Sequence, residues 1–135
     1  MRTVVDISAG TKPPDFTCTR AFAGLPESVS AARSWVAGFF PSPAAAADAA
    51  LMTSELFTNA ILYSASRLPG GQVTVSVGTG GGSVRVDVID QGEVPPCIAA
   101  PPGLGKGLEI VSQLADASCA DGPDRWFSLR TGGAW

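Results

Sequence analysis

The 135-residue chain contains no histidine, and its three cysteines form no CxxC pair. Without histidine, the chain has neither a Ser-His-Asp nor a Cys-His catalytic site, and no histidine-ligated zinc site. Because Cys18, Cys97 and Cys119 are widely spaced, we expect reduced thiols rather than a disulfide framework or a metal site. No apolar run approaches the roughly 18 residues that span a membrane, and the N-terminus lacks the apolar core of a signal peptide. These absences predict a soluble, cytoplasmic protein.

Strong charge and low complexity are also absent. Nine basic and twelve acidic residues give a net charge of −3, and the arginines are scattered, which argues against a nucleic-acid surface. The 16 glycines and 11 prolines stay below the share typical of low-complexity chains, while 45% apolar residues allow a real core. We expect residues 1–14 to form a flexible tail and residues 15–131 to form one domain.

Hydrophobic periodicity is the clearest feature that is present. Alternating polar and apolar residues predict strands, whereas apolar residues spaced by three and four predict helices. Two valine runs that flank a glycine-rich turn at residues 78–82 predict a hairpin. Ser42 is the expected N-cap of the second helix, with Pro43 at its first position. The expected strands cover residues 15–23, 73–77, 84–88, 117–120 and 125–130, and the helices cover 27–40, about 43–64 and about 105–115. This order predicts an α+β two-layer sandwich, a mixed, mostly antiparallel sheet with helices on one face.

The second predicted helix carries the first candidate for chemistry. Glu55 and Asn59 lie four residues apart and therefore project from the same side of this helix. A carboxylate beside an amide oxygen could accept a proton next to a metal-held phosphate. Taken alone, however, an ordinary solvent-facing polar arc explains the pair better.

The second candidate, Asp90 followed by Gly92, comes directly after the predicted hairpin. An acid two residues before a glycine is typical of a turn. Alternatively, Asp90 could accept a hydrogen bond from an exocyclic amine such as adenine N6, and Gly92 would let a ring approach the backbone.

The third candidate is a glycine-rich segment that leads into the third predicted helix, with glycines at 103, 105 and 107 around Lys106 and before Leu108. Free backbone N–H groups at a helix N-terminus favour an anion. The spacing is neither that of a P-loop nor that of a dinucleotide-binding βαβ unit, and a flexible hinge is the simpler alternative. In order along the chain, the three candidates supply a base with a metal ligand, an adenine contact and a phosphate cradle. A proline-rich loop over residues 93–104 lies between the last two as a lid, and together these parts predict an ATP site.

These motifs resemble those of the small bacterial anti-sigma-factor serine/threonine kinases, within the histidine-kinase-like ATPase (GHKL) superfamily. The resemblance covers roughly residues 16 to 130. Residues 25–33 resemble the segment that leads into the family's first helix, residues 54–60 its N-box, residues 90–92 its first glycine box and residues 105–111 its second.

The resemblance implies the Bergerat ATP-binding fold, with ATP and Mg²⁺ as cofactors. Asn59 would ligate the magnesium, Asp90 would hold adenine N6, and Glu55 would be the general base of the protein kinase reaction. The remaining implied nucleotide contacts are Gly92, Gly103, Gly105, Lys106, Gly107 and Leu108. The implied partners are an anti-sigma-factor antagonist protein of the STAS type and a sigma factor, and family members commonly form homodimers. No nucleic acid or membrane is expected as a direct partner.

The chain departs from the family pattern at three places. Tyr63 stands where the N-box usually continues with histidine, the lid is short and proline-rich, and Asp124 is placed where a threonine often contacts adenine. These departures leave open an alternative function. In that alternative, the chain is a catalytically weak or inactive nucleotide-binding module that sequesters a sigma factor or another regulator.

Overall fold

The computed structural model describes residues 16–93 and 106–131 of the chain. Its elements, in order, are β1 (Phe16–Ala23), α1 (Ser28–Ala37), α2 (Pro43–Tyr63), the short 3-10 helix η1 (Ala65–Arg67), β2 (Gln72–Gly80), β3 (Ser83–Ile89), α3 (Lys106–Leu114), β4 (Ala117–Cys119) and β5 (Asp124–Arg130). The predicted order of strands and helices is confirmed. The predicted tail over residues 1–14 lies outside the described residues.

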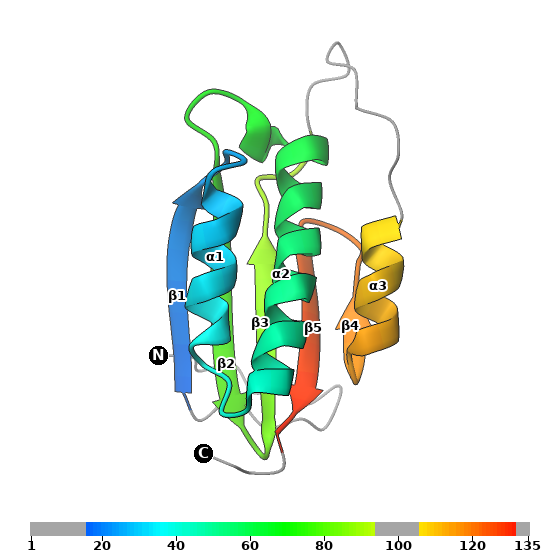
Figure 1. Cartoon of the computed structure of the whole chain (residues 1–135). Helices are drawn as coiled ribbons and strands as arrows, with labels where there is room; N and C mark the ends of the chain where they lie inside the picture. The colour runs from blue at the N-terminus through cyan, green and yellow to red at the C-terminus, as the bar shows by residue number, and fades with distance from the viewer. Residues whose placement is uncertain (1–15, 94–105, 132–135) are drawn as a thin grey trace.

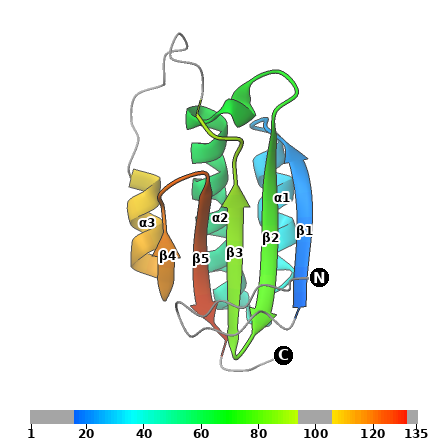
Figure 2. The ribbon, with the colours of Figure 1, turned by 180° about the vertical axis from the view of Figure 1, so that it is seen from behind.

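The five strands form one sheet in the order β1-β2-β3-β5-β4. The three α-helices lie on one face of this sheet (Figure 1), and no helix of the described residues covers the other face (Figure 2). The predicted α+β two-layer class is therefore confirmed. The described strand pairs are all antiparallel rather than mixed, because β5 lies between β3 and β4 and separates the two strands that α3 connects.

The β2–β3 hairpin is the most strongly specified part of the sheet. Gly81 and Gly82 form its turn with φ of +61° and +79°, a conformation that matches the twist of the flanking strands and favours glycine at both positions. Strand β2 continues to Gly80, which pairs with Ser83, so the turn is shorter than the predicted span of residues 78–82.

The core lies between the sheet and the helices. Alternate valines of β2 and β3 point to the helices and are fully buried, which is worth roughly 1.5–3 kcal/mol for each side chain. The largest fully buried side chains around them include Phe57, Phe127, Met52, Leu56, Val36 and Val111. Ser42 caps α2 as predicted, with its Oγ accepting a hydrogen bond from the Ala45 amide at 3.1 Å. None of the helices within the described ranges has the length and apolar character needed to cross a membrane.

Candidate nucleotide site

Helix α2 places Glu55 and Asn59 one turn apart, but in different surroundings. Asn59 is buried, with 7% of its surface exposed, whereas Glu55 is half-buried. The Asn59 Nδ2 donates a hydrogen bond to the Glu55 carbonyl oxygen at 2.8 Å, and no described residue donates to the Asn59 Oδ1. The simple solvent-facing arc does not describe Asn59, because a buried amide keeps an unused acceptor here. An oxygen of this kind suits a hard cation such as Mg²⁺.

Two hydrogen bonds tie the end of α2 to the turn after β3. The Ala65 amide donates to the Gly92 carbonyl at 2.8 Å, and the Gln91 amide donates to the Ser66 Oγ at 3.0 Å. The segment that follows the helix of the first motif therefore contacts the turn of the second motif, at one end of the sheet beside the end of β3 (Figure 1). Ser66 was not among the residues predicted from sequence, because its role depends on this long-range contact.

Asp90 is held on both of its carboxylate oxygens. Its Oδ1 accepts from the Gly92 amide at 2.7 Å, which closes a local turn, and its Oδ2 accepts from the Arg125 Nη1 at 2.6 Å. Gly92 has φ of +87° and open space where a Cβ would stand. The turn conformation therefore accounts for a glycine at position 92. The Asp90 side chain is only 3% exposed, and its oxygens retain lone pairs that could accept further hydrogen bonds.

The contact to Asp90 from β5 comes from Arg125, not from Asp124. Asp124 hydrogen-bonds Asp87 on the sheet face opposite to the helices, so its side chain does not reach Asp90. Asp124, which stands where the family's threonine often contacts adenine, thus lies on the opposite face of the sheet from Asp90. Arg125 shares its side of the strand with the buried Phe127 and Leu129, and this alternation was a sequence signal that could have identified it.

The glycine-rich segment is described only in part. Gly103 and Gly105 lie outside the described residues, as does the predicted lid beyond Glu93. Lys106 and Gly107 begin α3. Leu108 is partly buried against the core, and α3 packs against α2, so this helix starts beside the helix that carries the first motif. Tyr63, the half-buried last residue of α2, stands close to the same end of the sheet.

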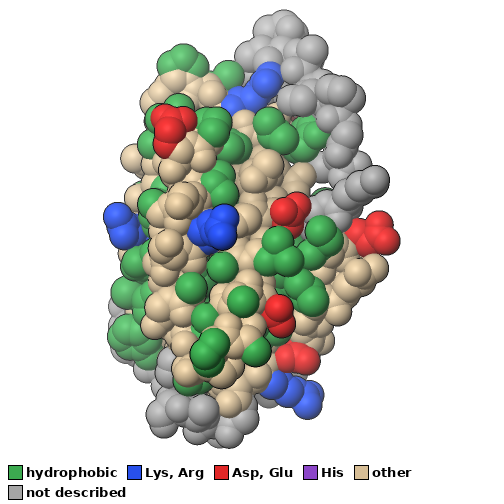
Figure 3. Space-filling view, viewed as in Figure 1, with side chains coloured by type: hydrophobic (Ala, Val, Ile, Leu, Met, Phe, Trp, Pro, Cys, Tyr) green, Lys and Arg blue, Asp and Glu red, His purple; other side chains and the backbone are tan. Residues whose placement is uncertain are grey.

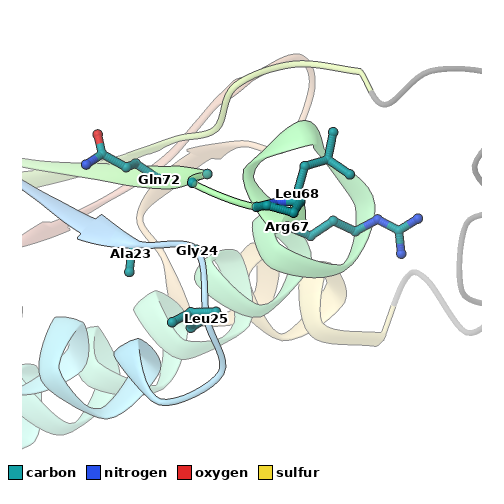
Figure 4. A pocket seen from close by; sticks show the side chains of 9 residues that line it. Ala23, Gly24, Leu25, Arg67, Leu68 and Gln72 are labelled. Atoms are coloured by element: carbon teal, nitrogen blue, oxygen red, sulfur yellow. The ribbon is translucent and has the colours of Figure 1, made fainter.

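An open groove of about 560 Å³ lies near this end but contains none of the predicted site residues. Figure 4 shows its wall, with the Arg67 side chain pointing away from Ala23 and Leu25. The lining residues are Ala23, Gly24, Leu25, Arg67, Leu68, Pro69, Gly70, Gly71 and Gln72. On the helix-covered face, acidic side chains lie in the region of α2 and α3 (Figure 3). A polyphosphate that binds there would need a cation to offset this negative charge.

No group of three or more metal-ligating side chains occurs within residues 16–93 and 106–131. A cation at Asn59 would need most of its ligands from a bound phosphate or from water.

The comparison with known families agrees with this geometry. The family model of the histidine kinase-like ATPase domain matches residues 22–123, which include α2, the Asp90–Gly92 turn and α3. No curated protein matches the chain. The match spans most of the chain and ends directly before β5, the strand that carries Arg125. The chain therefore belongs to the histidine kinase-like ATPase domain family.

Proposed function

We propose that this chain binds ATP with Mg²⁺ and acts as a serine/threonine protein kinase on an anti-sigma-factor antagonist. The observation that carries the proposal is the pair of hydrogen bonds between the end of α2 and the Asp90–Gly92 turn. These bonds set a buried carboxylate at the end of the helix that carries Glu55 and Asn59. Family membership supports ATP as the ligand, and the resemblance at residues 54–60 supports the kinase branch.

Each residue has a distinct part in this proposal. Asn59 would hold Mg²⁺ through its free Oδ1, and Asp90 would accept the adenine amino group. The bound nucleotide supplies a transferable phosphoryl group to a substrate hydroxyl. Glu55, half-buried and one turn from Asn59, accepts the proton of that serine or threonine hydroxyl as its oxygen attacks phosphorus. ADP leaves with the electron pair of the broken P–O bond.

The partners follow from the same resemblance. The substrate would be a small antagonist protein of the STAS type that presents a serine or threonine. The kinase itself would sequester a sigma factor, and both roles would be carried out by a homodimer in the cytoplasm.

Replacing Glu55 by alanine tests the catalytic part of the proposal. The wild type should transfer label from γ-labelled ATP to a STAS-type antagonist of the same organism, and Glu55→Ala should reduce transfer by about 100-fold or more. The variant should still bind Mg-ATP, because Glu55 is proposed to contact the proton and not the nucleotide. Calorimetry and autoradiography measure the two properties separately.

Asp48→Ala is the matched control, since Asp48 is a half-buried acid on the same helix two turns earlier. It should leave transfer unchanged. Nucleotide binding without transfer by the wild type would contradict the kinase proposal and favour the regulator-sequestering module instead. Equal transfer by wild type and Glu55→Ala would remove Glu55 as the base.

A further inference from the structure

The contact between Arg125 and Asp90 places a cation inside the nucleotide site. The Arg125 Nη1 lies 2.6 Å from the Asp90 Oδ2, and the side chains are 19% and 3% exposed. A second bond, from the Arg125 Nε to the Ala120 carbonyl at 3.1 Å, holds the guanidinium from its other edge. Two fixed points make this arginine a positioned group rather than a mobile surface side chain.

The sheet register directs Arg125 toward the helices. It pairs with Val88 of β3, whose side chain is buried under the helices, and it precedes the inward-facing Phe127 and Leu129 at alternate positions. An apolar residue would suit this place equally well or better, because a buried ion pair adds little net stability over a well-packed apolar pair. Stability alone therefore does not require Arg125.

Both partners retain unused hydrogen-bonding capacity. Of the five N–H groups of the guanidinium, one is given to Ala120 and one to Asp90, and no described residue accepts the other three. The two Asp90 oxygens each accept one described bond, from Arg125 and from Gly92, which leaves one further lone pair on each. A free acceptor therefore lies beside free donors.

An adenine edge matches this arrangement. Its amino group is a donor, and a ring nitrogen on each side of that group, N1 or N7, is an acceptor. We propose that Arg125 is a second base-reading residue, which donates to the ring nitrogen beside the amino group that Asp90 accepts. This inference rests on the proposed adenine contact of Asp90 and adds a specificity-determining residue to it.

Calorimetric titration of ATP, 1-deaza-ATP and 7-deaza-ATP, each with Mg²⁺, tests the assignment. The wild type should bind one of the two deaza analogues about tenfold or more weakly than ATP, since a hydrogen bond from a charged donor is lost. Arg125→Met should bind ATP about as weakly as the wild type binds that analogue, and should show no further loss with the analogue. Arg130→Met, an exposed arginine on the same strand, is the control and should match the wild type.

The outcomes separate this inference from the proposed function. No ATP binding by the folded wild type would overturn the proposed function, and the inference with it. If Arg125→Met binds ATP as tightly as the wild type or more tightly, the inference is overturned but the proposed function stands. The arginine would then only pair with Asp90 or block it. An equal loss with the analogue in both proteins would also overturn it. If Arg125→Met does not fold, equal affinity of the wild type for all three nucleotides is the overturning result.

Discussion

The pKa of the Asp124 carboxyl is raised from 3.8 to about 6 by partial burial, by its hydrogen bond to Asp87 and by the negative charge of Asp87. Arg85 opposes this shift, but the Arg85 guanidinium is already paired with Asp87 at 2.8 Å and lies over the Trp126 ring at 4.1 Å. The folded protein therefore holds a proton on this carboxyl that the unfolded chain has already released between about pH 4 and pH 6.

This raised pKa predicts a loss of stability with rising pH. In the folded state the proton is bound more tightly, so the contribution of Asp124 to stability falls from about pH 4 to about pH 6 and is constant above that. Asp124→Asn removes this dependence. Its melting temperature should exceed that of the wild type by ~2 °C at pH 7.5, a small gain because the side chain is largely exposed.

Thermal unfolding of both proteins from pH 4 to pH 8 measures the difference. The difference between the two melting temperatures should shrink as the pH falls from 6 toward 4, because the aspartate is protonated in both the folded and the unfolded states only below its unfolded pKa of 3.8. If the difference in melting temperature stayed constant from pH 4 to pH 8, the contact with Asp87 would not raise the pKa of Asp124 in the folded protein.

The loops that surround the end of α2 pack backbone against backbone. The Gly24 amide donates to the Gly71 carbonyl at 2.9 Å, and the Ser66 carbonyl fills the space that a Cβ would take on either glycine. A Cβ on Gly71 would stand 2.0 Å from the Ser66 carbonyl oxygen. Because these neighbours are backbone atoms, they cannot rotate away.

Gly71→Ala should therefore destabilise the fold by about 3 kcal/mol. Ser66 also accepts the Gln91 amide, so its displacement should weaken nucleotide binding as well. Gly38→Ala is the control, since a Cβ there would meet its nearest neighbour at 3.4 Å with φ of −64°, and it should stabilise the protein by about 0.5 kcal/mol. Denaturant unfolding measures both, and equal stability of the two variants would contradict the tight contact.

The elements themselves follow from local pattern, whereas their pairing does not. Alternating valines, the Ser42 cap and the Gly81–Gly82 turn are local signals, and each predicted element of the described residues is found within a few residues of its expected bounds. The position of β5 between β3 and β4 is set by long-range hydrogen bonds, which periodicity does not report. Because the sequence does not reveal this pairing, we expected a mixed sheet, whereas all the described strand pairs are antiparallel.

The same distinction applies to the candidate site. Glu55, Asn59 and Asp90 were identified from motif order, and the segment that follows the helix of Glu55 and Asn59 is hydrogen-bonded to the turn of Asp90. The burial of Asn59 could not be read from the helix alone, because it depends on what packs against that side. Arg125 was not predicted, although it alternates with Phe127 and Leu129 on the inward side of β5, because its contact with Asp90 depends on the pairing of β3 with β5.

In the whole molecule, the sheet order is what assembles the site. The end of β3 carries Asp90, the start of β5 brings Arg125 beside it, and α2 ends against the same turn (Figure 1). Helix α3 packs on α2 and begins with Lys106, close in sequence to the glycines at 103 and 105. The end of β3, the start of β5 and the segment after α2 thus meet, with α3 packed on α2, and this end of the sheet is where we propose that the nucleotide binds.

Titration of Mg-ATP into the wild type and Asn59→Ala, followed by calorimetry, tests this account most directly. Within the residues that the structure describes, the Asn59 side chain bonds only to a carbonyl of its own helix, so its truncation should leave the fold and the melting temperature nearly unchanged. The account predicts magnesium-dependent binding to the wild type, at least ~10-fold weaker in Asn59→Ala. Absence of binding to the folded wild type, or equal affinity of the two proteins with and without magnesium, would contradict it.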